Sequence, residues 1–207
     1  MLRPLVIASV LAGCGGGPST IPGDGSPPGD STGDGPPGPA GKRVFVSSMN
    51  TNANLAALGG GATGVEGADN MCNNFAGAAG LGGEWQAWIS DSTVDAIDRI
   101  TGSGPWFRMD GQMAFANKAN LTTSPMVPVV IDEKGRLLMF PPDLINTWTG
   151  TSAGGRFTPN NATCGDWTDG TISAEGTVGD AGEIDSGWTN FDKLDCDLQG
   201  RLYCLER

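Results

Sequence analysis

The 207-residue sequence contains no histidine, only one tyrosine and only five cysteines. The lack of histidine excludes a Ser-His-Asp triad and a Cys-His pair, because both need an imidazole as the base. It also argues against a zinc site, since the sequence has no C-x-x-C pair either. We therefore expect that this protein is not an enzyme.

Basic residues are also scarce: 12 Lys and Arg stand against 23 Asp and Glu, which gives a net charge of -11. Such a surface repels nucleic acid and anionic lipid headgroups, so we expect no nucleic-acid partner. A charged partner should be cationic. High acidity is also a general route to solubility, so it does not define a partner by itself.

The apolar run at residues 5–12 is only about half of the roughly 20 residues that a membrane-spanning helix needs. Arg3 precedes the run and small residues follow it, which is typical of a secretory signal peptide. A buried strand or core helix is the alternative, but Pro- and Gly-rich sequence follows at once and leaves the run nothing to pack against.

The four residues Leu11-Ala12-Gly13-Cys14 resemble the lipobox of bacterial lipoproteins. This resemblance implies that residues 1–13 are a signal peptide and that Cys14 carries the lipid that holds the protein at a membrane. The next residue is Gly15 and not the aspartate that often retains lipoproteins in an inner membrane. We therefore expect an exported protein on the outer membrane or the cell surface.

Residues 14–41 follow as a linker composed almost entirely of Gly, Pro, Ser, Thr and Asp. Such a segment cannot bury enough apolar surface to offset the entropy of ordering, so we expect a disordered stalk. Glycine recurs every third position at its end, as in collagen, but Ser26 and Thr32 interrupt the same frame. A plain linker is the preferred interpretation, and a trimeric stalk is the alternative.

Residues 42–207 have the length of one domain. Spacing of apolar residues by three and four predicts a helix over 64–81, and residues 91–100 are expected to form a short helix capped by Ser92. Strands are expected over 43–48, 85–90, 105–109, 113–116, 127–132, 136–140 and 201–206. The fold class is α+β, with two helices, short and mainly antiparallel strands, and long loops after Thr147.

Four cysteines remain in the domain: Cys72, Cys164, Cys196 and Cys204. In an exported chain an even number of cysteines predicts disulfides, here two. The residues alone allow three ways of pairing them.

Several segments of the domain resemble one family by their order and spacing: "GADNMC", "AAGLGGEWQAWIS", "VPVVIDEKGRLL", "TWTGTSAGGRF", "TCGDWT" and "LYCLE". They are similar to the endostatin-like domain of certain collagens, and more closely to its bacterial relative in surface lipoproteins, called domain of unknown function 1554. The resemblance covers about residues 43–207. It implies a C-type-lectin-like fold in which Cys72 pairs with Cys204 and Cys164 pairs with Cys196.

Two activities of similar domains do not carry over to this sequence. Endostatin binds zinc through histidines and heparin through arginine clusters, whereas this chain has no histidine and only scattered arginines. Sugar-binding C-type lectins hold calcium with a Glu-Pro-Asn or Gln-Pro-Asp loop, which this chain lacks. The resemblance therefore implies a binding domain without a known ligand.

Acidic residues crowd the last quarter of the chain, where flexible oxygen-rich loops would suit calcium. No EF-hand spacing is present, so freely solvated loops are the preferred interpretation and no cofactor is expected. If calcium is bound, the candidate ligands are Asp166, Asp169, Asp192 and Asp195.

The tryptophans could line a groove for a sugar or a peptide, or they could form the core. Those inside the family-like segments are expected in the core: Trp85, Trp88, Trp148 and Trp167. Trp188 lies in an acidic loop outside these segments. We therefore take Trp188 as the candidate for an exposed ligand contact.

Together these patterns predict a lipid-anchored protein of the bacterial cell envelope, whose domain binds an unidentified protein or glycan and does not catalyse a reaction. One alternative is a secreted polysaccharide hydrolase that uses a pair of carboxylates. Another is a purely structural envelope component. The oligomeric state is left open.

Overall fold

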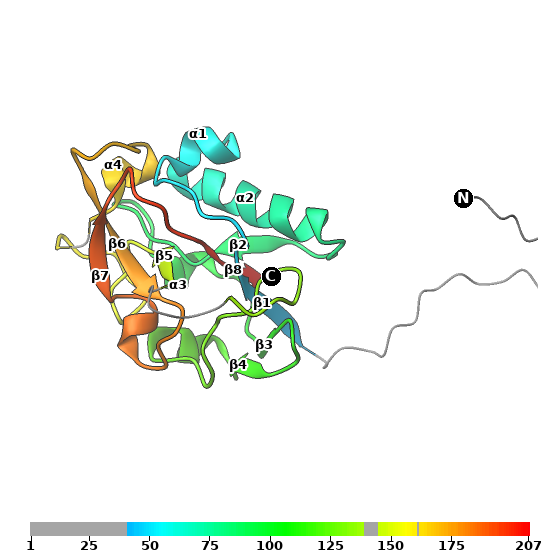
Figure 1. Cartoon of the computed structure of the whole chain (residues 1–207). Coiled ribbons are helices and arrows are strands. Elements are labelled where there is room, and N and C mark those ends of the chain that lie inside the picture. The colour runs from blue at the N-terminus through cyan, green and yellow to red at the C-terminus, as the bar shows by residue number, and fades with distance from the viewer. Residues whose placement is uncertain (1–40, 139–144, 161) are drawn as a thin grey trace, which may run out of the picture. The chain divides into compact units, whose positions relative to one another are not determined.

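The computed structural model describes residues 41–138, 145–160 and 162–207, which form an α+β domain with two sheets (Figure 1). This confirms the α+β class, but the described residues hold four α-helices where two were expected. The predicted signal peptide, Cys14 and all of the linker except Gly41 lie outside the described residues. Within the described ranges, no helix is long and apolar enough to span a bilayer.

The larger sheet has five strands in the order β2-β8-β1-β3-β4. Its strands are β1 (Lys42–Val46), β2 (Trp85–Ala87), β3 (Trp106–Arg108), β4 (Met113–Phe115) and β8 (Tyr203–Glu206). The pair β1 and β3 is parallel, and the other neighbours are antiparallel. Phe45 lies opposite Cys204, so the first and last strands of the domain are adjacent.

A second, antiparallel sheet has the order β5-β6-β7. It consists of β5 (Asn146–Trp148), β6 (Glu175–Asp180) and β7 (Asp192–Asp195). The sequence predicts loops here, so this sheet corrects that expectation. Glycines 176 and 179 of β6 are buried under Trp148 and Trp188, and a Cβ at Gly179 would lie 1.9 Å from the Trp188 carbonyl oxygen.

The helices lie mainly in the first half of the domain: α1 (Leu55–Gly59), α2 (Gly64–Ala78), α3 (Ala96–Arg99) and α4 (Cys164–Trp167), with 3-10 turns η1 (Lys118–Thr122) and η2 (Ser186–Trp188). The helix predicted over 64–81 is confirmed as α2. Thr63 caps it by accepting the Glu66 N–H, and Glu66 accepts the Ala62 N–H. Gly67 allows α1 to cross close to α2, because a Cβ there would lie 2.1 Å from the Leu55 carbonyl oxygen.

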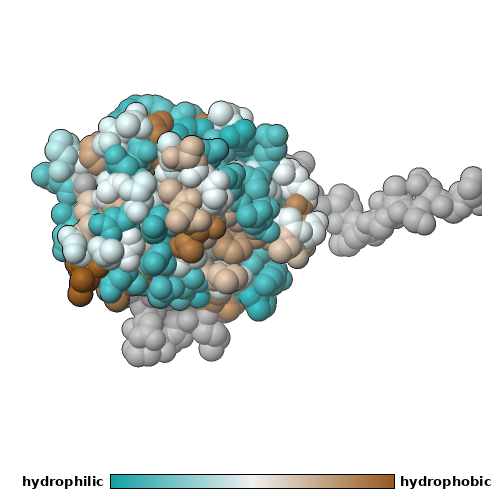
Figure 2. Space-filling model, turned by 90° about the horizontal axis from the view of Figure 1, so that it is seen from above, coloured by the Kyte–Doolittle hydropathy of each residue, from teal (hydrophilic) through white to brown (hydrophobic). Residues whose placement is uncertain are grey.

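The core has two parts, one on each face of the larger sheet. Val44 and Val46 of β1 belong to one cluster and Phe45 to the other, as strand alternation requires. Helix α2 covers the Phe45 side with Ala68, Cys72 and other apolar residues. All six tryptophans are buried, which confirms the core prediction for Trp85, Trp88, Trp148 and Trp167. On the outer face seen in Figure 2, hydrophobic residues lie in small groups among hydrophilic ones.

Two local predictions need correction. The helix expected over 91–100 begins only at Ala96, with Asp95 and not Ser92 at its N-cap. The strands expected over 127–132 and 136–140 are reduced to a bridge between Ile131 and Leu137, while residues 139 and 140 lie outside the described residues.

Candidate functional site

Two disulfides tie the layers of the domain together. Cys72 of α2 is bonded to Cys204 of β8, and Cys164 of α4 is bonded to Cys196, which follows β7. These are the two pairs that the family resemblance implies. All four residues are buried, so the bridges act as parts of the core.

The segment called α4 is an unusual left-handed turn. Its four residues, Cys164, Gly165, Asp166 and Trp167, have φ angles of 49°, 59°, 55° and 65°. This conformation costs roughly 1–2 kcal/mol for each residue other than glycine. The Cys164–Cys196 bridge and the Trp167 indole, which donates to the Ser90 carbonyl oxygen at 2.8 Å, hold the turn in place.

Asp166 fixes the same turn through its carboxylate. It accepts hydrogen bonds from the backbone N–H and hydroxyl of Ser92 at 3.0 and 2.6 Å, and from the Thr163 hydroxyl at 3.1 Å. Burial acts to raise the pKa of Asp166, but the hydrogen bonds from Ser92 and Thr163 outweigh it and lower the pKa. The oxygens of this candidate calcium ligand are therefore engaged within the protein.

The other candidate calcium ligands lie elsewhere. Asp169 accepts the Thr171 N–H, Asp192 accepts the Lys193 N–H, and Asp195 lies opposite Glu175 on β6. Within the part of the chain that the structure describes, no three histidine, cysteine or acidic residues are grouped so that they could hold a metal ion.

The prediction that Trp188 is an exposed contact is wrong. Its side chain is only 1% exposed and stacks on Trp88 with ring centroids 5.2 Å apart. Phe115 and Tyr203 pack around the same ring, and the Tyr203 hydroxyl donates to the Trp188 carbonyl oxygen at 2.8 Å. Trp188 is thus the inward-facing residue of its acidic loop.

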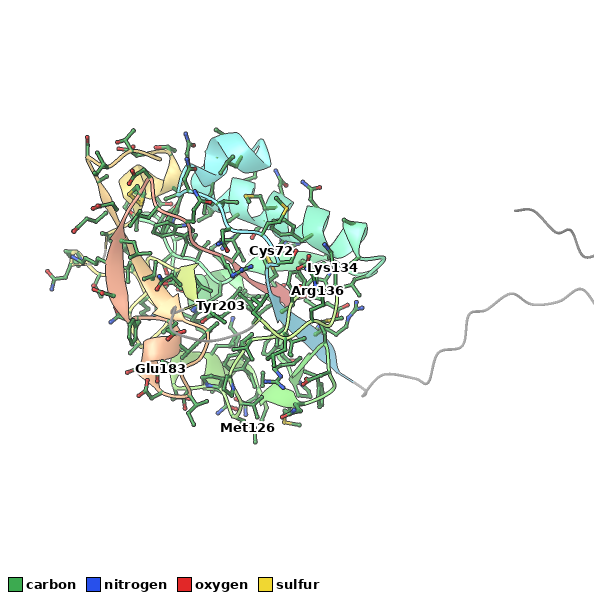
Figure 3. The ribbon with its side chains drawn as sticks, in the orientation of Figure 1. Cys72, Met126, Lys134, Arg136, Glu183 and Tyr203 are labelled. Carbon is green, nitrogen blue, oxygen red and sulfur yellow. A yellow bond between two sulfur atoms is a disulfide. The ribbon has the colours of Figure 1, made fainter. Side chains whose placement is uncertain are left out.

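The same loop instead exposes a different aromatic residue. Phe191 is 42% exposed and Ile184 is 57% exposed, whereas all six tryptophans and Tyr203 are buried. Glu183, Asp185 and Phe191 converge above Gly187: their nearest atoms lie 3.0–3.3 Å from the position that a Cβ of this glycine would occupy. We call Glu183, Ile184, Asp185, Phe191 and Asp192 the η2 surface. Figure 3 shows Glu183 at the periphery beside η2 and Tyr203 in the interior.

Buried hydrogen bonds hold the η2 surface in place from below. Thr189 is fully buried; its hydroxyl accepts from the Trp88 indole at 2.7 Å, and its carbonyl oxygen accepts from the Thr149 hydroxyl at 2.6 Å. The Phe191 N–H donates to the Val178 carbonyl oxygen at 2.8 Å, and Asp185 caps η2 by accepting the Gly187 N–H at 2.7 Å. The exposed side chains therefore project from a backbone that is fixed on both sides.

A hollow of about 490 Å³ lies at the end of β1, β3 and β8. Its two arginines and Glu206 are already paired: Arg43 donates to Glu206 through Nε and Nη2, and Arg108 donates to Asp110. Lys42 also lines the hollow and forms no salt bridge within the described residues. The hydrogen bond from Arg43 to Glu206 raises the pKa of Arg43, and the one from Arg108 lowers the pKa of Asp110. This hollow offers a ligand few charged groups that are not engaged within the protein.

An acid-lined hollow of about 310 Å³ contains Asp91, Asp95 and Asp98, and it is the place to look for the carboxylate pair of a hydrolase. Asp91 accepts the N–H groups of the next turn, and Asp95 and Asp98 both accept from Arg156, at 2.6 and 3.0 Å. These carboxylates are engaged in turn hydrogen bonds and ion pairs.

Protein-family models and the curated proteins contain no match to this chain. The resemblance to the bacterial endostatin-like domain therefore stays a prediction from the sequence.

Proposed function

We propose that this chain is an exported protein of the bacterial cell envelope, attached by a lipid on Cys14, whose C-type-lectin-like domain works by binding a partner and not by catalysis. The observation that carries the export is the pair of buried disulfides, because such bridges persist in oxidising compartments outside the cytoplasm. The lipobox-like residues before Cys14 supply the means of attachment.

The η2 surface supports binding as the mode of action. An exposed aromatic residue on a fixed backbone provides contact area at low entropic cost, which is what a recognition surface needs. The acids of the hollow around Asp91 are engaged in turn hydrogen bonds and ion pairs, so they give less support to the hydrolase alternative.

The attachment is tested in the native host by metabolic labelling with a radioactive or clickable fatty acid. We expect the wild-type chain to take up the label and to sediment with membranes, and the Cys14→Ser variant to do neither. The matched control Ser9→Ala leaves the cysteine and should behave as wild type. An unlabelled, uncleaved wild-type chain would overturn the attachment.

The binding role is tested by applying the full-length chain to arrays of glycans and peptides. Saturable binding that is lost on substitution of Phe191 would support a recognition domain. Binding to neither class of ligand would favour the purely structural alternative, and release of shortened sugars from the array would favour the hydrolase.

A further inference from the structure

Residues 162–197 carry the excess negative charge of the domain. Nine acidic residues lie in this range with a single cation, Lys193. The salt bridges among the described residues all lie outside it: they join Arg43, Arg99, Arg108, Lys134, Arg136, Arg156 and Arg207 to acids at other positions. The carboxylates of this segment therefore generate a field that no ion pair within the described residues neutralises.

The η2 surface combines this charge with exposed apolar side chains. Glu183 and Asp185 lie beside Phe191 around Gly187, while Ile184 stands between the two acids in the chain and Asp192 follows Phe191. None of the three carboxylates forms a salt bridge within the described residues. An exposed aromatic residue beside unpaired charges of one sign is the composition of an interface centre with an electrostatic rim.

We infer that the η2 surface binds a basic peptide segment in which lysine or arginine stands next to an apolar side chain. The apolar side chain of the partner covers Phe191 and Ile184, and its cations meet the three surrounding carboxylates. This inference rests on the proposed binding function and names the partner's chemistry.

The negative charge of the η2 surface favours a basic peptide over a second copy of the chain and over a neutral glycan. A second copy of the chain would place the same carboxylates near one another across a two-fold axis, where they repel. A neutral glycan would stack on Phe191 but would gain no electrostatic attraction to the carboxylates. A basic peptide uses both the apolar and the charged parts of the surface.

The probe is a synthetic peptide of lysine and leucine, titrated into the full-length chain by calorimetry. One comparison peptide replaces the lysines by glutamate, and another replaces the leucines by glycine. We expect only the lysine–leucine peptide to bind well, and its binding should weaken as sodium chloride is raised, because salt screens exposed charges.

Phe191→Ser should weaken this binding by about tenfold, as expected for loss of a central contact. Ile172→Ser is the matched control, since Ile172 is 71% exposed and precedes the end of β6 that lies far from η2. Ile184→Ser gives a second measurement if Phe191→Ser fails to fold, which a melting curve by circular dichroism reveals.

The charge is tested by two triple variants that each remove three acids. The variant Glu183→Gln, Asp185→Asn and Asp192→Asn alters the η2 surface. The side-chain amide oxygen of Asp185→Asn can still cap η2 by accepting the Gly187 N–H. The variant Asp169→Asn, Glu175→Gln and Asp197→Asn removes the same charge elsewhere in the segment. We expect the first to bind about tenfold more weakly and the second to change binding by less than about twofold.

Equal weakening in both triple variants would overturn the inference, because the attraction would then be diffuse. Equal binding of the glutamate or glycine peptide, or wild-type binding by both Phe191→Ser and Ile184→Ser, would overturn it as well. If the fatty-acid label is absent while the lysine–leucine peptide binds, the attachment fails and the inference stands. If the label is present and the peptide does not bind, the inference alone fails.

Discussion

Asp166 accepts hydrogen bonds from both the backbone N–H and the hydroxyl group of Ser92, although 74 residues separate them in the chain. These bonds stabilise a left-handed turn that an alanine would disfavour. We expect Asp166→Ala to lower the free energy of unfolding by about 2 kcal/mol. Asp166→Asn should lower the free energy of unfolding by less, since asparagine tolerates this conformation and keeps a hydrogen-bond acceptor. Urea unfolding measures both, and an Ala variant as stable as wild type would contradict this role.

Substitution of two glycines of α2 by alanine should change the stability of the domain in opposite directions. A Cβ at Gly67 would lie 2.1 Å from the Leu55 carbonyl oxygen, whereas a Cβ at Gly77 would have no atom within 4 Å. Gly67→Ala should therefore destabilise the domain by about 1–3 kcal/mol or more, because α1 must move away. Gly77→Ala should stabilise it by about 0.5–1 kcal/mol. The difference in thermal midpoint between the two variants checks the close crossing of α1 and α2.

Peptide mapping without reduction should join Cys72 to Cys204 and Cys164 to Cys196. The first bridge spans 132 residues and the second spans 32. In the chain-entropy model the longer loop contributes about 5 kcal/mol and the shorter about 4 kcal/mol. Replacing both cysteines of a pair by alanine should thus cost more for Cys72 and Cys204. A peptide that joins Cys164 to Cys72 would refute the pairing.

The burial of all six tryptophans predicts a blue-shifted emission that acrylamide quenches poorly. Phe191→Trp should add one accessible fluorophore and a steep quenching component. Trp188→Phe removes a buried ring, so it should leave the accessible fraction unchanged. A quenchable component in the wild-type emission that disappears in Trp188→Phe would show that the loop does not bury Trp188.

Acid should destabilise the domain partly through Asp110, whose pKa is lowered from 3.8, chiefly by the hydrogen bond from Arg108. Because the folded pKa lies below the unfolded one, its stabilising contribution is fully present above pH 3.8 and is lost as the pH falls through the folded value. We therefore expect Asp110→Asn to be less stable than wild type at neutral pH and to lose less stability on acidification. Urea midpoints measured across this range test the sign.

Local patterns in the sequence identify part of the fold well. The helix over 64–78 and the strand at 42–46 follow from apolar spacing, and both are set by their own residues. The second sheet could not be predicted, because β6 reads "EGTVGD" and owes its burial to Trp148 and Trp188, which lie far from it or in the next loop. Ser92 looks like a helix cap, but Asp166 binds its N–H and hydroxyl, and the helix starts later.

The prediction that Trp188 is an exposed ligand contact failed for the same reason, because distant residues decide which side chains of the loop are buried. Composition marks the loop around Trp188 as acidic and solvated, and that part of the prediction points to the loop that carries the η2 surface. It cannot tell that Trp188 faces inward, since its neighbours Trp88, Phe115 and Tyr203 come from distant segments. Phe191 carries no motif, so only the fold distinguishes it from the buried aromatic residues.

The central position of β1 determines how the domain responds to mechanical load. The strand is hydrogen-bonded to β3 on one side and to β8 on the other, and the Cys72–Cys204 bridge covalently fastens β8 to α2. Tension applied through residue 41 acts along β1, so it shears two ladders at once and does not peel away an edge strand. A partner that pulls on the domain would therefore be resisted by the middle of the sheet.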